Sequence, residues 1–365
     1  MGLVHLGVRA ALVEGSVVAG DVAVEDGRIA AVGVDPAGAA GLAVPGFVDV
    51  HINGFGGVDF LAADAEGYRR ASAALAATGV TAYLPTFVSS PLDTYRHALA
   101  VVSEALGFSG GPAILGVHLE GPFLSASWPG AHDAACLRSP DPALVDELSA
   151  IAPVRLMTVA PELPGGLDLV AGLVERGIVV SCGHSDADAA TAHAAFDRGA
   201  RAITHIYNAH RRWKPRDPGL AGAALVRDDV TVQAIVDDVH LAPETAYGAF
   251  LAAGERFCLV TDAIEAAGLD PGTSRLGHRT VNVRDGAVRL PDGTLAGSVL
   301  TIDQAVRNLV AKGASLAQAV HAASRAPALL VDRPDLGRTT VVGGTGRCAH
   351  AGASVPARCA AICPK

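Results

Sequence analysis

From Gly46 onward, eight short apolar segments rich in β-branched residues alternate with longer Ala-rich segments. The short segments read as strands and cover Phe47–Val50, Val80–Leu84, Ile114–Leu119, Val154–Val159, Ile178–Cys182, Ala202–Ile206, Val230–Val236 and Arg256–Val260. Between them, Glu66–Ala77, Thr94–Leu106, Pro142–Ala150 and Ala187–Arg198 have the composition and apolar spacing of helices. Strands that alternate with helices pair in parallel through right-handed crossovers. Eight such units in roughly 250 residues predict an α/β fold of the (β/α)8 TIM type rather than a doubly wound sheet.

The N-terminal region has a different pattern. Val17–Val24 alternates in hydrophobicity, Glu25–Arg28 has the composition of a turn, and Ile29–Val32 resumes the alternation, as in a β-hairpin. A second predicted hairpin, Arg279–Val283 with Ala287–Leu290, follows the eighth strand. The N-terminal hairpin predicts a small β-domain attached to the barrel.

These patterns divide the 365 residues into two parts. We expect the barrel in residues 45–330, and a small β-sandwich domain built from residues 1–44 and 331–365. Half of the residues are apolar and 18% are charged, so a large core can be buried. No apolar stretch reaches the roughly 18–20 residues of a membrane span. Glu14 interrupts what would be the apolar part of a signal peptide, so a cytoplasmic enzyme is expected.

Charge and cysteine content narrow the function further. The net charge of −9 argues against a nucleic-acid partner, although it is compatible with a small anionic ligand where positive charge is concentrated locally. Six cysteines are present, and three of them (Cys348, Cys359 and Cys363) lie near the C-terminus. Such a distribution is typical of reduced thiols and not of a disulfide framework or a zinc knuckle.

Polar residues follow most of the predicted strands. These residues are His51 and Asn53 after the first strand, Glu120 after the third, His184 after the fifth, His205 and Asn208 after the sixth, Asp237 and His240 after the seventh, and Asp262 after the eighth. In a (β/α)8 barrel all these positions lie on the C-terminal rim, which houses the active site. The sequence therefore predicts a catalytic centre on this rim.

Three of the rim residues form a candidate metal site. Glu120, His184 and His205 supply one carboxylate and two imidazoles, a donor set that leaves a coordination position open for water. Each residue alone is also compatible with a structural hydrogen bond, but their convergence on one rim favours a shared ion. Asp262 ends an apolar strand, where it could take a proton from the attacking water and return it to a leaving amine. A helix N-cap is the alternative role for Asp262.

The segment His51-Ile52-Asn53 bears on the number of ions. Alternation along a strand points His51 and Asn53 the same way. Two histidines here would complete a second site, whereas the neutral amide of Asn53 is a weak ligand for divalent cations. We therefore expect one divalent ion per subunit, with Zn2+ as the first candidate and Fe2+, Mn2+ or Co2+ as alternatives.

Basic residues are concentrated in one loop after the sixth strand. The loop carries Arg211, Arg212, Lys214 and Arg216. Arginine is suited to bidentate contact with phosphate, so the loop could bind a phosphorylated ligand. A solvated loop without a ligand is an equal alternative.

The order of these motifs resembles the N-acetylglucosamine-6-phosphate deacetylases, a branch of the amidohydrolase superfamily. The matching stretches are PGFVDVHINGFGG, HLEGPFL, PGAHD, GHSDAD, THIYNA, DPGLAGAAL, VDDVHL, LVTDAI and LAGSVLTIDQAVRNL. They run from residue 45 to about residue 330 and so cover the predicted barrel. HLEGPF together with GHSDAD and THIYNA carries most of the specificity.

The resemblance implies a reaction and a set of site residues. It implies deacetylation of N-acetylglucosamine 6-phosphate to glucosamine 6-phosphate and acetate, with Glu120, His184 and His205 on the metal and Asp262 as general acid and base. It further implies that His132 stabilises the oxyanion, with Arg216 on the phosphate, often across a homodimer interface. The remaining sugar-site residues implied are Asn208, Ala209, His240 and the loop residues Leu295, Ala296, Gly297 and Ser298.

The C-terminal segment departs from this pattern. After Arg338 the chain reads TTVVGGTGRCAHAGASVPARCAAICPK, in which apolar alternation stops. A reading-frame shift near residue 338 would explain the change. Because the predicted catalytic rim lies before this point, we expect such a shift to lower the stability of the protein more than its activity. Two rival functions stay open. The first is another amidohydrolase, acting on a different N-acyl or cyclic amide or deaminating a base. The second is a non-catalytic sugar-phosphate binder.

Overall fold

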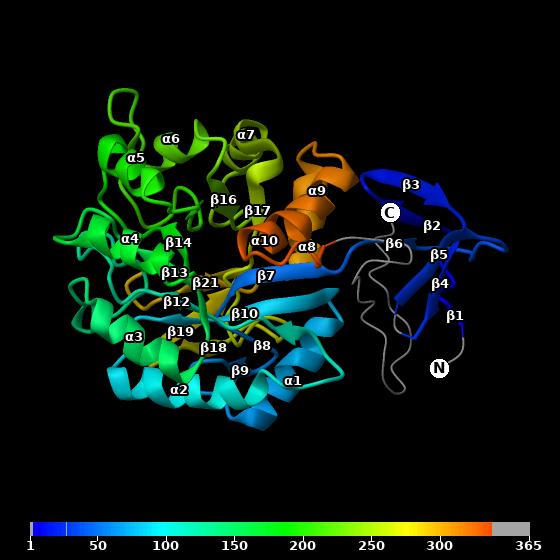
Figure 1. Ribbon diagram of the computed structural model, residues 1–365, viewed down its shortest axis with the longest axis horizontal. Helices are drawn as coiled ribbons and strands as arrows, with labels where there is room; N and C mark the ends of the chain where they lie inside the picture. Colours follow the sequence, from blue (N-terminus) through cyan, green and yellow to red (C-terminus); the bar gives the residue numbers. More distant parts are fainter. Residues whose placement is uncertain (1–2, 27, 338–365) are drawn as a thin grey trace.

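The computed structural model describes residues 3–26 and 28–337, and its largest part is a parallel sheet rolled into a barrel (Figure 1). The eight barrel strands are β7 (Phe47–Ile52), β10 (Val80–Val88), β12 (Val117–Glu120), β13 (Val154–Val159), β14 (Val179–Cys182), β15 (Ala202–Ile203), β16 (Thr231–Ala234) and β17 (Phe257–Leu259). Each pairs in parallel with the next in this order. The ring is completed beyond β17, where the N–H of Asp262 donates to the carbonyl of His51 at 2.8 Å. The predicted α/β barrel is confirmed.

Helices cover the outside of this barrel (Figure 1). They are α1 (Ala65–Ala76), α2 (Leu92–Ala105), α3 (Pro142–Ile151), α4 (Gly166–Glu175), α5 (Ala189–Asp197), α6 (Gly219–Leu225), α7 (Pro243–Ala253), α8 (Ile302–Ala311), α9 (Leu316–Ala323) and α10 (Arg325–Leu330), with short 3-10 turns at Ala134–Cys136 and Gly254–Arg256. Aspartate side chains accept from free backbone N–H groups at three helix starts, through Asp64, Asp141 and Asp188. The four helices predicted from the sequence begin and end within about two residues of the observed helices α1, α2, α3 and α5.

Several predicted strands differ from the observed ones in their bounds, and for two of them the backbone shows the reason. The predicted strand Ile114–Leu119 is divided into β11 (Ala113–Ile114) and β12, because Gly116 adopts a φ of 131° that interrupts the extended backbone. The predicted strand Ala202–Ile206 ends early at Ile203, and His205 already has a φ of 27°. The early end turns the His205 side chain into the rim.

Residues 4–43 form six short strands beside the barrel (Figure 1). These are β1 (Val4–His5), β2 (Ala10–Val13), β3 (Ser16–Ala19), β4 (Asp21–Glu25), β5 (Arg28–Val34) and β6 (Leu42–Ala43), arranged in two sheets, β1-β4-β5 and β3-β2-β6. They enclose a small apolar core of their own. The predicted continuous strand Val17–Val24 is wrong: it breaks at Gly20, whose φ is 110° and where a Cβ would lie 2.5 Å from Gly33. The halves therefore join different sheets, while the β4–β5 hairpin forms as predicted.

The division of the chain into a barrel and a small β-domain stays our proposal. The strands of residues 4–43 support its first part. Residues 338–365, which were expected to complete the small domain and which carry the suspected frame shift, lie outside the described residues. Among the described residues, no helix is both long and apolar enough to cross a membrane.

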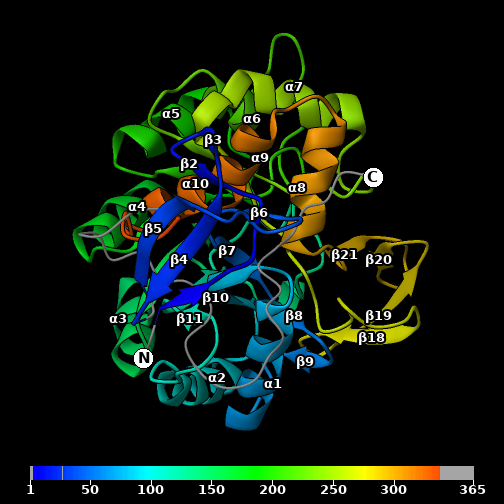
Figure 2. The same cartoon turned by 90° about the vertical axis from the view of Figure 1, so that its right-hand side faces the viewer.

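The second predicted hairpin is part of a four-stranded antiparallel sheet at the rim (Figure 2). Its strands are β18 (Thr273–Leu276), β19 (Arg279–Arg284), β20 (Ala287–Arg289) and β21 (Leu295–Ser298). Ser298 bridges in parallel to Ala263, just beyond β17, so β21 continues the barrel wall at its C-terminal end. The two-stranded sheet of β8 (Gly54–Phe55) and β9 (Val58–Asp59) also follows a barrel strand. Both insertions thus add to the rim on which the polar residues lie.

Candidate metal centre and substrate cavity

The structure brings the predicted metal ligands together at the carboxyl ends of their strands. Glu120 is the last residue of β12, while His184 and His205 follow β14 and β15. Glu120 Oε1 lies 3.0 Å from His184 Nε2 and 3.1 Å from His205 Nε2. One donor atom from each residue lies within 4.8 Å of the others, and all three side chains are buried. This arrangement can hold a divalent cation.

The backbone around these ligands is strained. His184, His205 and Asp262 have φ values of 48°, 27° and 49°, in the left-handed region that non-glycine residues rarely adopt. Ala209, in the loop after β15, has a φ of 51°. Such strain is typical of functional sites, where the surrounding structure holds side chains in an otherwise unfavourable position.

The hydrogen bonding of His184 indicates that a cation belongs between it and Glu120. Nδ1 of His184 lies 3.0 Å from the carbonyl oxygen of Trp128, which can only accept, so Nδ1 carries the hydrogen. In the neutral ring, Nε2 then presents a lone pair to Glu120 Oε1 at 3.0 Å. Two electron-rich atoms at this separation repel unless a metal ion or a proton lies between them. A carbonyl partner of this kind is typical of metal-bound histidine.

His51 completes a second group of donors on the other side of Glu120. Its Nε2 lies 3.4 Å from Glu120 Oε2 and 3.3 Å from Asp262 Oδ1. Burial alone would lower the pKa of His51, but the carboxylates of Glu120 and Asp262 raise it to about 10. For Glu120 the effects are reversed. Burial would raise the pKa of this carboxyl, whereas His51 and the other surrounding imidazoles hold it well below its ordinary value. Nearby positive charge therefore stabilises the ionised forms of Glu120 and Asp262, and a metal ion would also supply such charge.

Asn53 does not offer a second metal ligand next to His51. Its side-chain amide donates to Asp262 Oδ1 at 2.6 Å, and its Oδ1 is buried without a hydrogen-bond partner. A second ion would therefore be held by His51, Glu120 and Asp262, whose donor atoms also lie within 4.8 Å of one another. Asn53 orients Asp262.

His132 has the opposite hydrogen-bonding pattern to His184. The backbone N–H of Ser89 donates to His132 Nδ1 at 3.1 Å, so this nitrogen accepts. The hydrogen of the neutral ring is therefore on Nε2, which lies 3.4 Å from Glu120 Oε2. His132 is consequently arranged to donate a hydrogen bond beside the metal centre, whereas His184 is arranged to coordinate.

A cavity of about 460 Å3 opens above these groups. It is lined by Val88, Glu120, Ser127, Trp128, Pro129, Gly130, Ala131, His132, His184, His205, Asn208, Ala209, Arg212, His240, Asp262, Leu276, Thr294, Leu295 and Gly297. The volume is in the usual range of small-ligand sites, about 300–1,000 Å3. The predicted residues His132, Asn208, Ala209 and His240 are thus brought together with the metal ligands.

The predicted loop residues Leu295 to Ser298 divide between two faces of β21. Leu295 and Gly297 line the cavity, whereas Ala296 and Ser298 do not, since successive residues of a strand face opposite ways. Ser298 instead donates to the carbonyl oxygen of Thr261 at 2.6 Å. Its position supports the turn that carries Asp262.

Arg216 is exposed and does not line the cavity of its own chain. The cavity residues Trp128, Arg212 and Thr294 were missed as site residues, although Arg212 belongs to the basic loop noted in the sequence. Asp237 also contributes indirectly, because its Oδ2 lies 2.8 Å from His240 Nδ1. The sequence already placed Asp237 on the rim, after the seventh predicted strand, but did not assign it this contact with His240.

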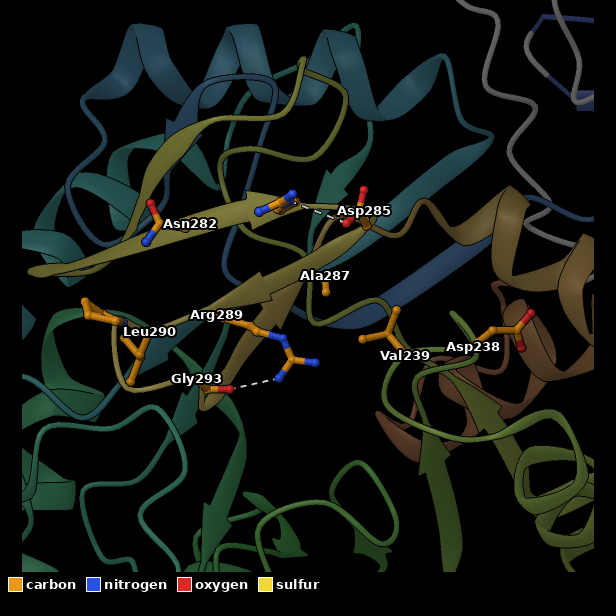
Figure 3. A pocket seen from close by; sticks show the side chains of 10 residues that line it. Asp238, Val239, Asn282, Asp285, Ala287, Arg289, Leu290 and Gly293 are labelled. Atoms are coloured by element: carbon orange, nitrogen blue, oxygen red, sulfur yellow. Dashed lines mark hydrogen bonds and ion pairs between the residues drawn. The ribbon is translucent and has the colours of Figure 1, made fainter.

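A second hollow of about 620 Å3 lies against β19 and β20 (Figure 3). Its lining includes Asp238, Asn282, Arg284 and Arg289, and none of the predicted site residues. Arg289 donates to the carbonyl oxygen of Gly293 at 2.8 Å, as Figure 3 shows. The hollow bears charges of both signs but contains no histidine, whereas the other cavity is lined by four.

Comparison with known proteins places this site in a family. The amidohydrolase family model matches residues 42–341. N-acetylglucosamine-6-phosphate deacetylase of Bos taurus is 39% identical over 304 residues, which cover 79% of this chain and 74% of the relative. N-acetylgalactosamine-6-phosphate deacetylase of Escherichia coli O157:H7 is 35% identical over 316 residues, covering 84% of each.

A solved structure is similar to this chain in both sequence and fold. An aspartate-to-alanine variant of N-acetyl-D-glucosamine-6-phosphate deacetylase from Mycobacterium smegmatis, in complex with N-acetyl-D-glucosamine 6-phosphate, superposes with a TM-score of 0.87. It is 33% identical, and the match covers 94% of this chain and 92% of that one. The chain therefore belongs to the amidohydrolase family, in its N-acetylglucosamine-6-phosphate deacetylase branch.

Proposed function

We propose that this protein hydrolyses the acetamide of N-acetylglucosamine 6-phosphate, releasing glucosamine 6-phosphate and acetate. The observation that carries the proposal is the cavity in which Glu120, His184 and His205 meet Asp262 and His132. Because the relatives named for this activity match along most of their length, the substrate class is inferred from them.

The ion and its number belong to the same proposal. We place one Zn2+ per subunit on Glu120, His184 and His205, with Fe2+, Mn2+ or Co2+ as alternatives. When bound, such an ion would polarise the acetyl carbonyl and acidify a water molecule. We further propose a cytoplasmic homodimer without nucleic-acid or membrane partners.

Asp262 and His132 supply the proton chemistry in this proposal. Burial would raise the pKa of Asp262, but His51 holds it below its ordinary value, so the carboxylate is ionised and can accept a proton from water. As the C–N bond breaks, Asp262 returns that proton to the departing amine. Nε2–H of His132 donates to the carbonyl oxygen as negative charge develops on it.

The remaining cavity residues would position the sugar. Asn208, Ala209, His240, Leu295 and Gly297 line the cavity around the reacting amide. Ala296 and Ser298 contribute through β21, which they hold in place. Arg216 would reach a phosphate only from a second subunit, since it lies off the cavity of its own chain.

The test is hydrolysis by the purified, zinc-loaded protein. Acetate release is measured with N-acetylglucosamine 6-phosphate, N-acetylgalactosamine 6-phosphate and the corresponding unphosphorylated sugars. The galactosamine arm is included because a relative of that name matches 84% of the chain. The proposal is supported if kcat/KM is highest for N-acetylglucosamine 6-phosphate. Absence of acetate release from every phosphorylated sugar would overturn it and leave the sugar-phosphate binder as the rival.

A further inference from the structure

Arg212 is a charged residue of the cavity that the proposed chemistry leaves unused. In the described part of the chain, it is the one Lys or Arg side chain that lines the cavity. The guanidinium has no carboxylate within ion-pair distance among the described residues, and the side chain is exposed. An uncompensated cation at the mouth of a ligand cavity attracts an anionic group of the ligand.

The neighbouring basic residues of the same loop are committed or point elsewhere. Arg211 donates through Nε to both carboxylate oxygens of Asp217, at 3.1 and 3.0 Å, and through Nη1 to the carbonyl of Asp186. Lys214 and Arg216 are exposed and do not line the cavity. Arg212 is therefore the member of the loop that is available to a ligand in its own chain.

The Arg212 side chain is also held in place. Its guanidinium carbon lies 5.7 Å from the ring centroid of Trp128, within the range of a cation–π contact. Trp128 is fixed in turn, because its indole N–H donates to Asp186 Oδ1 at 2.8 Å. Stacking of Trp213 on Tyr207, with centroids 6.0 Å apart and planes 14° apart, braces the rest of the loop. A guanidinium positioned before ligand binding loses less entropy when it forms bidentate hydrogen bonds.

We infer that Arg212 is an in-chain contact for the 6-phosphate of the substrate, and that Trp128 positions it. This inference rests on the proposed function. C2 and C5 lie opposite each other across a pyranose ring, so the acetamide and the 6-phosphate leave opposite ends of the sugar. With the acetamide at the metal centre, the phosphate is directed away from Glu120 and Asp262. Arg212 recognises it and thereby selects phosphorylated over unphosphorylated sugars.

The test compares Arg212→Gln with Lys214→Gln, which removes the same charge from the same loop. For Arg212→Gln we expect kcat/KM with N-acetylglucosamine 6-phosphate to fall about 10- to 100-fold, mainly through KM, with the unphosphorylated sugar unaffected. Lys214→Gln should change neither by more than about twofold. Arg212→Lys should recover part of the loss, since it keeps the charge but not the planar fork.

A binding measurement separates this inference from the proposed function. The chain's two tryptophans, Trp128 and Trp213, both lie beside Arg212, so tryptophan fluorescence can follow titration with glucosamine 6-phosphate and with glucosamine. Weaker binding of only the phosphorylated sugar by Arg212→Gln supports the inference even where the wild type shows no turnover. Equal losses for both sugars, or a loss with Arg216→Gln but none with Arg212→Gln, would overturn it.

Discussion

Two histidines of one cavity are prepared for different tasks by single hydrogen bonds to the backbone. The carbonyl of Trp128 fixes the hydrogen of His184 on Nδ1, and leaves its Nε2 as a metal donor. The backbone N–H of Ser89 fixes the hydrogen of His132 on Nε2, and makes that nitrogen a hydrogen-bond donor. The same side-chain type thus supplies a ligand and an electrophile, because each ring has a different backbone partner.

The role of Asp262 predicts the effect of Asp262→Asn. We expect kcat to fall by about 10²–10⁴, since the amide can neither accept a proton from water nor return one to the amine. Bound metal should stay near the wild-type level, because Glu120, His184 and His205 are unchanged. The measurement is steady-state acetate release together with elemental analysis of the protein. The matched control is Asp285→Asn in the exposed β19–β20 turn; full turnover by Asp262→Asn would rule out the role.

Asn53 predicts how many ions the site takes up. The wild type should bind one ion per subunit, because the side chain at position 53 donates to Asp262 instead of coordinating. Asn53→His removes that donation and offers an imidazole, so the ratio is expected to rise towards two when zinc is in excess. Plasma emission spectrometry after gel filtration measures the ratio, with Asn53→Ala as the control that should stay near one. Two ions in the wild type would contradict the prediction.

At the scale of elements, what could be predicted from the sequence depended on local pattern. The barrel strands are apolar and buried, so hydrophobic runs located them, and the polar residues after most of these runs located the rim. Long-range contacts gave no such signal. Trp128 and His184 are 56 positions apart, and nothing in either segment predicts their hydrogen bond. The break of Val17–Val24 was missed because it depends on the close approach of Gly20 to Gly33, which only the folded sheets produce.

The two small sheets of residues 4–43 are linked through the Asp21 carboxylate at the start of β4. Burial would raise the pKa of this group, but the backbone N–H groups of Val8, Val22 and Gly7, which donate at 2.7–3.1 Å, and nearby His5 hold it below its ordinary value. A depressed folded pKa adds stability that is present above the unfolded value of about 4 and is lost as pH falls through the folded pKa.

We therefore expect Asp21→Asn to lower the free energy of unfolding near neutral pH by about 1–3 kcal/mol. The difference from wild type should shrink as the pH falls below about 4, where the wild-type carboxyl also becomes neutral. Urea unfolding followed by circular dichroism at several pH values measures both effects. Glu25→Gln, an exposed carboxylate at the end of the same strand, is the control and should show little change. A difference that is constant with pH would contradict the linkage.

At the scale of the whole molecule, the site is assembled from segments far apart in the chain. Asn53 and Asp262 are 209 positions apart, yet their side chains lie 2.6 Å apart because the last barrel strand closes against the first. His184 and Glu120 are 64 positions apart and meet across the rim. An ion held by Glu120, His184 and His205 would therefore join three different barrel strands, and its binding should stabilise the closed barrel as well as the chemistry.

Removal of the ion should consequently lower the thermal stability of the whole chain. A ligand that binds only the folded state contributes about 3 kcal/mol at a free concentration of about 100 Kd, which corresponds to a Tm difference of several degrees, about 3 °C or more. Scanning calorimetry of the zinc-loaded protein before and after dipicolinate treatment measures the difference, and added zinc should restore it. Glu120→Gln is the control: it weakens the site, so its Tm should be low and insensitive to the chelator. An equal shift in that variant would mean that the stabilising ion lies elsewhere in the molecule.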